Sequence, residues 1–547
     1  MDTHTSRRGI ALGRAALLDR CLLVLLAALA LLSVPALVLA EGSRSLFPAS
    51  YPAAGARAPM DLTNNAAYAG VAQNRQFLYV YAQAGEFILL GSRNRSNGGD
   101  IFVYNPQSFG VRGLETVPAS ADFTCSSNSP PAGSFGGTGR GSIATRAAEL
   151  AGPNSADGTV TATDGWLPCA YRAPVSGVYG VRFTGATSGT QTLAATPAQN
   201  APQILANQVS AWEVQVRAAA NTRTDINGRL FTYAWIGRTG GNGAAGRVFH
   251  ALYYITEDGY RYEQRMNALD PFAYALYANR AGFLDGGAPL YKSVRGDNQL
   301  ATNILPAGSG VSAQPPQYPM FFSDVRDTGP NDAEVERVLG ALGLPTVPPV
   351  PQLISVAFTG TVSSDTTTLG AGGVFTFTTI NTLTYEIVVS RDGVNFDPAN
   401  PLNKVLTGNA LSGTHTVWWN GRDNSGALFP VGSGYRYRIA GRNGEVHFPI
   451  IDTEGMALGG PTVRKLNGSQ DAIVYFDDRG YVTRNGTAVG QLNGHLCGAG
   501  NLQVQPTPNH SLLGVDSSDS NFNGAGIYYR FYPQVTNDPN TDCVNNA

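Results

Sequence analysis

Phe77-Leu78-Tyr79-Val80-Tyr81 begins the clearest series of strand patterns in the sequence. Its aromatic side chains alternate with Leu78 and Val80, and alternation with a period of two residues is typical of a β-strand. After Gly85 come two more short apolar runs, Phe87-Ile88-Leu89-Leu90 and Ile101-Phe102-Val103-Tyr104. Runs of this length and composition, separated by turn residues, predict that the chain folds mainly as β-sheet.

The same patterns continue toward the C-terminus. The runs 248–255 and 260–266 flank Glu257-Asp258-Gly259, which predicts a hairpin. Residues 332–342 combine a helical apolar stripe with end signals, because Asn331 or Asp332 can cap the start and Gly343 stops the helix. The sequence therefore predicts an all-β chain with one short helix.

We expect tandem β-sandwich domains and not a repeat array, since no period of roughly 20–50 residues recurs. The segment 171–183 indicates a turn into a closing strand, and on this segment residues 76–205 resemble the jelly-roll modules of bacterial secreted proteins. The expected boundaries are 1–40 for a signal peptide, 41–75 for a low-complexity lead-in, 76–205 for the jelly-roll-like sandwich, 206–344 for a β-rich domain with the helix, 345–351 for a Pro-rich linker, 352–450 for a second sandwich and 451–547 for a β-rich C-terminal domain with a polar tail.

Residues 352–450 carry a more specific motif. Val417-Trp418-Trp419-Asn420-Gly421 ends a strand pattern in a turn, and Pro430-Val431-Gly432-Ser433-Gly434-Tyr435 opens the next strand. These residues resemble the immunoglobulin-like module of flagellar hook-capping proteins, in which a strand ends in W-(D/N)-G and P-x-G-x-Y opens the last long strand. The chain departs from that pattern at Asn420, where Asp is usual, and by the insertion of Ser433-Gly434 before Tyr435. The resemblance implies an immunoglobulin-like β-sandwich in a bacterial secreted or surface protein.

The first 40 residues have the composition of an export signal. An uncharged apolar run, 21–40, follows an arginine-rich start and ends in Val38-Leu39-Ala40. We expect cleavage after Ala40; the alternative is an uncleaved membrane anchor, since the run is long enough to span a bilayer. Ser6-Arg7-Arg8 also suits a twin-arginine signal, but Asp19 and Arg20 precede the apolar run and favour the general secretion route.

Composition excludes two classes of partner. Charged residues make up 14% of the chain and the net charge is −2, whereas ordinary soluble domains are roughly 25% charged. Such a chain has no overall field that would recruit nucleic acid or anionic lipid. We expect no nucleic-acid partner, and membrane contact only through the N-terminal run if it is uncleaved. The 65 glycines predict many short strands joined by tight turns.

Four of the five cysteines lie beyond the leader. An even number in an exported chain predicts disulfides. The local pairing, Cys125 with Cys169 and Cys497 with Cys543, is favoured because the two pairs fall in different expected domains. The other pairings are formally allowed, and a zinc site is a further alternative, although the sequence has no C-x-x-C spacing.

One segment matches the first half of a calcium loop. In 519–524, Asp519, Asn521 and Asn523 would supply oxygen ligands while a glycine makes the bend. The twelfth position holds Arg530 instead of an acid, so a plain Asn/Gly turn is the alternative. Asp477-Asp478 and Asp423-Asn424 are weaker versions of the same pattern.

Trp418 and Trp419 are adjacent on an expected strand, so their side chains must point to opposite faces. One of them belongs in the core of the sandwich. The other is a candidate for stacking against a sugar ring, unless a neighbouring domain covers it.

No catalytic motif is found, because the chain lacks the G-x-S-x-G, H-E-x-x-H and P-loop patterns. Its histidines are scattered, and His250 and His415 lie in expected strands, where a structural role is the default. A carboxylate pair for glycoside hydrolysis leaves no local signature. Glu257, Asp258 and Asp270 are acids of that kind, and we assign no catalytic residue.

The sequence therefore predicts a non-enzymatic exported protein with a structural or adhesive role at a bacterial cell surface. We expect its partners to be surface glycans or other surface proteins, met at loop tips and exposed edges, and no cofactor besides calcium. Two alternatives stay open. One is a carbohydrate-binding or carbohydrate-active secreted protein, and the other is a subunit of a secreted appendage or surface layer.

Overall fold

The computed structural model describes most of the chain between Glu41 and Asn467. The described residues are 41–62, 77–108, 118–187, 207–239, 246–269, 273–285, 288–289, 311–313, 315–398, 400–451 and 461–467, together with the strand residues 473–474, 481–482, 488–489, 515–516 and 544–546.

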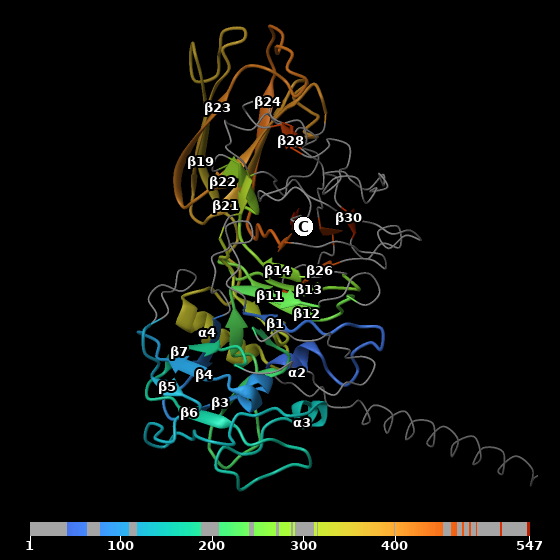
Figure 1. Ribbon diagram of the computed structural model, residues 1–547. Helices are drawn as coiled ribbons and strands as arrows, with labels where there is room; N and C mark the ends of the chain where they lie inside the picture. Colours follow the sequence, from blue (N-terminus) through green and yellow to red (C-terminus); the bar gives the residue numbers. More distant parts are fainter. Residues whose placement is uncertain are drawn as a thin grey trace, which may run out of the picture. The chain divides into compact units, whose positions relative to one another are not determined.

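Most of the described secondary structure is β-strand in several antiparallel sheets, which confirms the all-β prediction (Figure 1). The largest sheet has nine strands in the order β26-β13-β12-β18-β10-β2-β7-β4-β5. Its strands are β2 (Leu78–Ala82), β4 (Ile101–Tyr104), β5 (Phe123–Thr124), β7 (Gly177–Phe183), β10 (Leu230–Thr232), β12 (Ala251–Ile255), β13 (Arg261–Arg265), β18 (Met320–Phe321) and β26 (Thr462–Lys465).

Two smaller sheets cover one face of the nine-stranded sheet. One has the order β31-β25-β14-β11-β1-β8 and the other the order β6-β3-β9. Apolar side chains from all three sheets form one core, which includes Val80, Leu90, Trp212 and Trp235. We call this three-sheet unit the body. Its remaining strands are β1 (Met60–Asp61), β3 (Phe87–Ser92), β6 (Cys169–Arg172), β8 (Gln208–Val209), β9 (Trp212–Arg217), β11 (Ala234–Arg238), β14 (Ala273–Tyr277), β25 (Pro449–Ile451) and β31 (Val544–Asn546).

The opposite face of the nine-stranded sheet is covered by helix α4 (Asp332–Leu342), with the boundaries that the sequence predicts. Val335, Val338 and Leu339 are fully buried against Tyr79 of β2 and its neighbours. The helix ends at Gly343, which has a φ of 73°, a backbone conformation that favours glycine. Strand β2 therefore has both faces buried, Leu78 and Val80 toward the main core and Tyr79 toward α4.

The other helices of the described residues are short: α2 (Ser43–Leu46), α3 (Arg146–Ala151) and the 3-10 helix η2 (Arg93–Asn97). In the part of the chain that the structure describes, no helix has the length and apolar character needed to cross a bilayer. The remaining short strands are β15 (Phe283–Asp285), β16 (Ala288–Pro289), β17 (Val311–Ala313), β27 (Ile473–Val474), β28 (Tyr481–Val482), β29 (Ala488–Val489) and β30 (Val515–Asp516).

Strands from the ranges 76–205 and 206–344 share sheets. Strand β10 pairs with β2, placing Leu230 opposite Val80, and β9 pairs with β3, placing Val214 opposite Leu90. The two ranges, which the sequence patterns present as successive blocks, therefore build one common core in the described residues.

The segment 41–62 is also part of the body. Strand β1 lies between β11 and β8, and Leu46, Phe47 and Met60 are at most 1% exposed in the main core. Residues 41–62 of the expected lead-in at 41–75 therefore contribute to the main core, and residues 63–75 lie outside the described residues.

Residues 353–442 form a second β-sandwich, which we call the module. It packs a sheet of order β19-β20-β23 against a sheet of order β22-β21-β24, around Phe375, Phe377 and Ile387. Its strands are β19 (Leu353–Gly360), β20 (Gly373–Thr379), β21 (Leu383–Ser390), β22 (Lys404–Ala410), β23 (Gly413–Trp419) and β24 (Arg436–Arg442). After β24 the chain returns to the body, where β25 pairs with β14 and β26 with β13. The module is therefore an insertion in the chain of the body.

Candidate functional site

The adjacent tryptophans of β23, Trp418 and Trp419, differ in burial. Trp419 is 5% exposed, packs edge-on against Phe429 with ring centroids 5.0 Å apart, and donates its indole N–H to the Arg422 carbonyl at 2.9 Å. Trp418 points to the other face and is 57% exposed. The structure thus confirms that the pair divides between core and surface, and Trp418 is the exposed member of the pair.

Trp418 belongs to the outer face of the β19-β20-β23 sheet, which we call the threonine face. Strand register aligns its outward residues in three rows across the sheet. The rows are Thr359, Val374 and Trp418; Ala357, Thr376 and Thr416; and Ile354, Thr378 and Thr414. None of these nine residues is charged, and the hydroxyls of Thr378 and Thr414 lie 3.0 Å apart in a hydrogen bond.

The outer face of the second sheet has the opposite character. Arg436, Arg438 and Arg442 are exposed along β24, and Arg438 and Arg442 both approach the carboxylate of Glu386, at 3.5 and 3.1 Å. One sandwich therefore presents a neutral hydroxyl-rich face and a cationic face.

Three loops meet at one end of the module. Because adjacent strands are antiparallel, the loops 361–372, 391–403 and 420–435 leave the sandwich at the end opposite to the chain's entry at 352 and exit at 443. We call them the distal loops. The chain bends at 391–393 after β21, and ten further residues follow before β22, so the connection is not a tight hairpin.

Side-chain amides hold the distal loops in place. Asn403 donates from Nδ2 to the carbonyls of Asn395 and Asp397, each at 3.0 Å, and Asn424 reaches from a different loop to the carbonyls of Pro398 and Asn400 at 2.9 and 3.0 Å. These contacts satisfy loop carbonyls that would otherwise need water, and they fix two of the three loops against each other.

Asp423 is a further link between these loops. It is 1% exposed, accepts hydrogen bonds from the Ser425 hydroxyl at 2.6 Å and the Ala427 N–H at 2.9 Å, and pairs with Arg391 at 3.3 Å. The carboxylate is thus occupied by protein donors. This arrangement gives Asp423-Asn424, one of the two weaker calcium patterns, a structural role.

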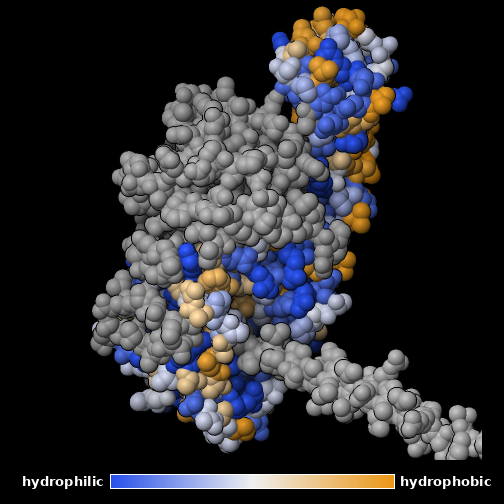
Figure 2. All heavy atoms as spheres, turned by 90° about the vertical axis from the view of Figure 1, so that its right-hand side faces the viewer, coloured by the Kyte–Doolittle hydropathy of each residue, from blue (hydrophilic) through white to orange (hydrophobic). Residues whose placement is uncertain are grey.

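Apolar side chains are exposed on the distal loops. Val394 is 82% exposed and Val431 is 85% exposed, and Leu369 and Leu402 are each at least half exposed. The loops of the two valines are in contact, since a Cβ on Gly393 would lie only 2.5 Å from the Gly434 carbonyl oxygen. Figure 2 shows hydrophobic residues gathered at one end of the module. No sequence pattern predicts this patch, because its members come from three separate loops.

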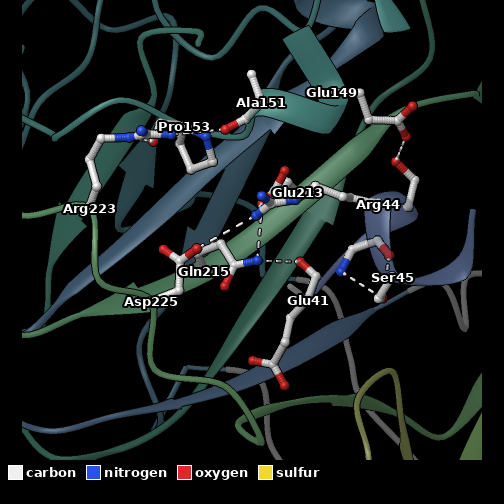
Figure 3. A network of polar contacts seen from close by, with 12 residues as sticks. Glu41, Arg44, Ser45, Glu149, Ala151, Pro153, Glu213, Gln215, Arg223 and Asp225 are labelled. Atoms are coloured by element: carbon white, nitrogen blue, oxygen red, sulfur yellow. Dashed lines mark hydrogen bonds and ion pairs between the residues drawn. The ribbon is translucent and has the colours of Figure 1, made fainter. Parts of the chain in front are cut away.

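The body contains a buried polar cluster around the segment that starts at Glu41 (Figure 3). Arg44 pairs with Glu213 and lies 3.5 Å from Asp225, and Gln215 donates to both the Glu41 carbonyl and Glu213. A second group joins Arg57 and Arg146 to Glu149, which also accepts from the Ser43 hydroxyl. These charges bind residues 41–57 to the body.

Burial shifts the pKa values of these acids in different directions. Desolvation raises the pKa of Glu41 to about 7, although the Ser323 hydroxyl and the N–H groups of 228–230 partly oppose it. Desolvation likewise raises the pKa of Glu213 to about 7, against the effect of Arg44. For Glu149, desolvation is outweighed by Arg57, Arg146 and Ser43, and its pKa is lowered. All three are sealed from solvent, so they act on stability and not on a substrate.

The other residues considered for chemistry have structural partners. Burial lowers the pKa of His250 to about 3, and its Nε2 lies 2.8 Å from the Tyr274 hydroxyl. Glu257 pairs with Arg280 at 2.7 Å, and Asp258 accepts from the Gly444 N–H at 2.6 Å. Both acids line a small surface hollow together with Glu445, which contacts His447. Asp270 lies outside the described residues.

The disulfide between Cys125 and Cys169 is present, with Cα atoms 5.6 Å apart. Cys497 and Cys543 lie outside the described residues, as do the calcium candidates Asp519, Asn521 and Asn523 and the weaker pattern Asp477-Asp478. Within the described ranges, no three His, Cys, Asp or Glu side chains gather as a metal site would require.

In comparisons with known proteins, no family model, no curated protein and no solved structure matches this chain. Its function must therefore be inferred from its own residues.

Proposed function

We propose that this is an exported, non-enzymatic adhesive or structural protein of a bacterial cell surface, and that the distal loops of its module dock onto a surface protein. The observation that carries the proposal is the pairing of fixed loops with exposed apolar tips at Val394 and Val431. A loop surface held by internal hydrogen bonds loses little conformational entropy on binding. Exposed apolar residues gathered in one place are typical of protein interaction sites.

Two other features support export. The Cys125–Cys169 disulfide is of the kind that persists in oxidising compartments and is rare in the cytoplasm. The arginine-rich and apolar composition of residues 1–40 suits a secretion signal. The hook-capping resemblance of 352–450 fits the same kind of protein.

The test uses beads coated with the full mature chain and mixed with intact cells of the producing bacterium. We expect the beads to attach, and we expect a Val394→Ser, Val431→Ser double variant to lose most of that attachment. The matched control is Val347→Ser with Val350→Ser, since these valines are 75% and 73% exposed but lie in the linker at 345–351. Protease treatment of the cells should abolish attachment if the partner is a protein. Equal attachment by wild type and the distal-loop variant would refute the proposal.

A further inference from the structure

We propose that the threonine face of the module binds a neutral glycan, with Trp418 stacking against one sugar ring. This inference goes beyond the docking role of the distal loops and uses different residues. The sequence left open which of two tryptophans is free to stack; the structure supplies the residue, its surroundings and the class of ligand.

Trp418 is exceptional among the tryptophans of this chain. The chain has five, and Trp166, Trp212, Trp235 and Trp419 are each at most 5% exposed. The indole is the largest apolar side chain, and leaving 57% of it in water forgoes burial that the fold achieves for the other four. An exposed ring of this kind on a rigid strand costs little ordering entropy when a flat ligand covers it.

The neighbours of Trp418 suit a chain of sugars. Thr416 and Thr414 follow on the same face of β23, and residues two apart on a strand are about 6.6–6.8 Å apart. A glycan with one ring on Trp418 would therefore pass over rows of hydroxyls, each of which can donate and accept a hydrogen bond. Sugar hydroxyls need both hydrogen-bond donors and acceptors, while the C–H faces of a pyranose ring pack on an aromatic ring.

Charge selects the class of glycan. None of the nine outward residues of the threonine face is charged, whereas the opposite face carries Arg436, Arg438 and Arg442. Of the two outer sheet faces of the module, the arginine face is the one that would attract an acidic glycan. The threonine face has no cation to attract a carboxylate or sulfate, so a neutral glycan is the ligand it fits.

The experiment uses the full mature chain on an array of neutral and acidic oligosaccharides, followed by titration with the strongest neutral ligand. Because Trp418 is the sole exposed tryptophan of the chain, iodide quenching of tryptophan fluorescence reports on it directly. We expect the ligand to protect the fluorescence from quenching. By calorimetry, Trp418→Ala should weaken binding at least about tenfold. Trp418→Phe should retain most of the affinity, and Thr416→Val should lose part of it.

The Val394→Ser, Val431→Ser variant is the matched control and should bind the glycan as wild type does. Loss of cell attachment in this double variant and loss of glycan binding in Trp418→Ala are therefore independent results. The inference is overturned if no neutral glycan binds, if only acidic glycans bind, or if Trp418→Ala binds as tightly as wild type.

Discussion

The acids buried with Glu41 give a prediction at the scale of single residues. A carboxyl group whose pKa is raised by folding holds a proton that the unfolded chain has already released. Its contribution to stability is therefore complete below the unfolded value of 4.5 and is lost as the pH rises to about 7. For Glu41 and Glu213 the loss is on the order of 3 kcal/mol each.

Burial of His250 acts in the opposite direction below about pH 6.5, because its pKa is lowered on folding, but the two acids together outweigh this one group. We therefore expect the thermal unfolding midpoint of the body to fall as the pH rises from about 5 to 8. Glu213→Gln should reduce this fall, because it removes one of the two titrating groups. The control is Glu257→Gln, at an acid that is 42% exposed. A midpoint that is constant or rises over this range would contradict the raised pKa values of Glu41 and Glu213. A midpoint that falls with pH as steeply in Glu213→Gln as in wild type would contradict the raised pKa of Glu213.

At the same scale, the sequence predicts that Trp418 and Trp419 point to opposite faces of the sheet. It does not predict which of the two is buried. Adjacent strand residues must point to opposite faces, which follows from backbone geometry alone. Which of the two faces the core depends on how the β19-β20-β23 sheet packs against the other sheet, and that is a property of the whole sandwich. The exposed Val394 and Val431 could not be predicted for the same reason, since their loops meet only in the folded module.

At the scale of elements, local signals predict α4 and fail for the segment 41–62. Helix α4 carries its own apolar stripe and its glycine stop, so its bounds follow from neighbouring residues. Strand β1 has two residues and is formed because it pairs with β11 on one side and β8 on the other. No periodicity can exist over two residues, so only the folded sheet reveals it.

The docking of this N-terminal segment can be tested at Arg57. Arg57 and Glu149 are both 0% exposed and form an ion pair. Arg57→Met should lower the free energy of unfolding by about 3–5 kcal/mol, because it leaves a buried carboxylate with fewer partners. In the control, Arg265→Met removes an arginine that is 56% exposed beside Glu263, and the expected loss is below about 1 kcal/mol. Urea denaturation measures both, and similar losses would show that the Arg57 pair does not hold the segment.

At the scale of the whole molecule, the positions of the strands are easier to predict from the sequence than the pairing of one strand with another. The nine-stranded sheet takes strands from residues 78 to 465, and β26 joins β13 across an inserted module. The pairing of strands so far apart in the sequence depends on how all the apolar faces of the body pack together. A local sequence pattern carries no information about that packing. The Cys125–Cys169 pair could be predicted, because few cysteines compete and the two are close in sequence.

The burial of Glu41 also bears on the proposed export. Glu41 is 0% exposed, and α2 follows two residues later. A signal peptidase could not reach a cleavage site next to it in the folded body. If the leader is removed after Ala40, cleavage must precede folding, and a route that exports unfolded chains meets this requirement.

Peptide mass spectrometry of the native protein, digested without reduction after cell fractionation, tests the central claim of export most directly. We predict that the protein is found outside the cytoplasm, begins at Glu41 and yields a linked peptide pair containing Cys125 and Cys169. Recovery from the cytoplasm, with residues 1–40 still attached and free thiols at both cysteines, would contradict it.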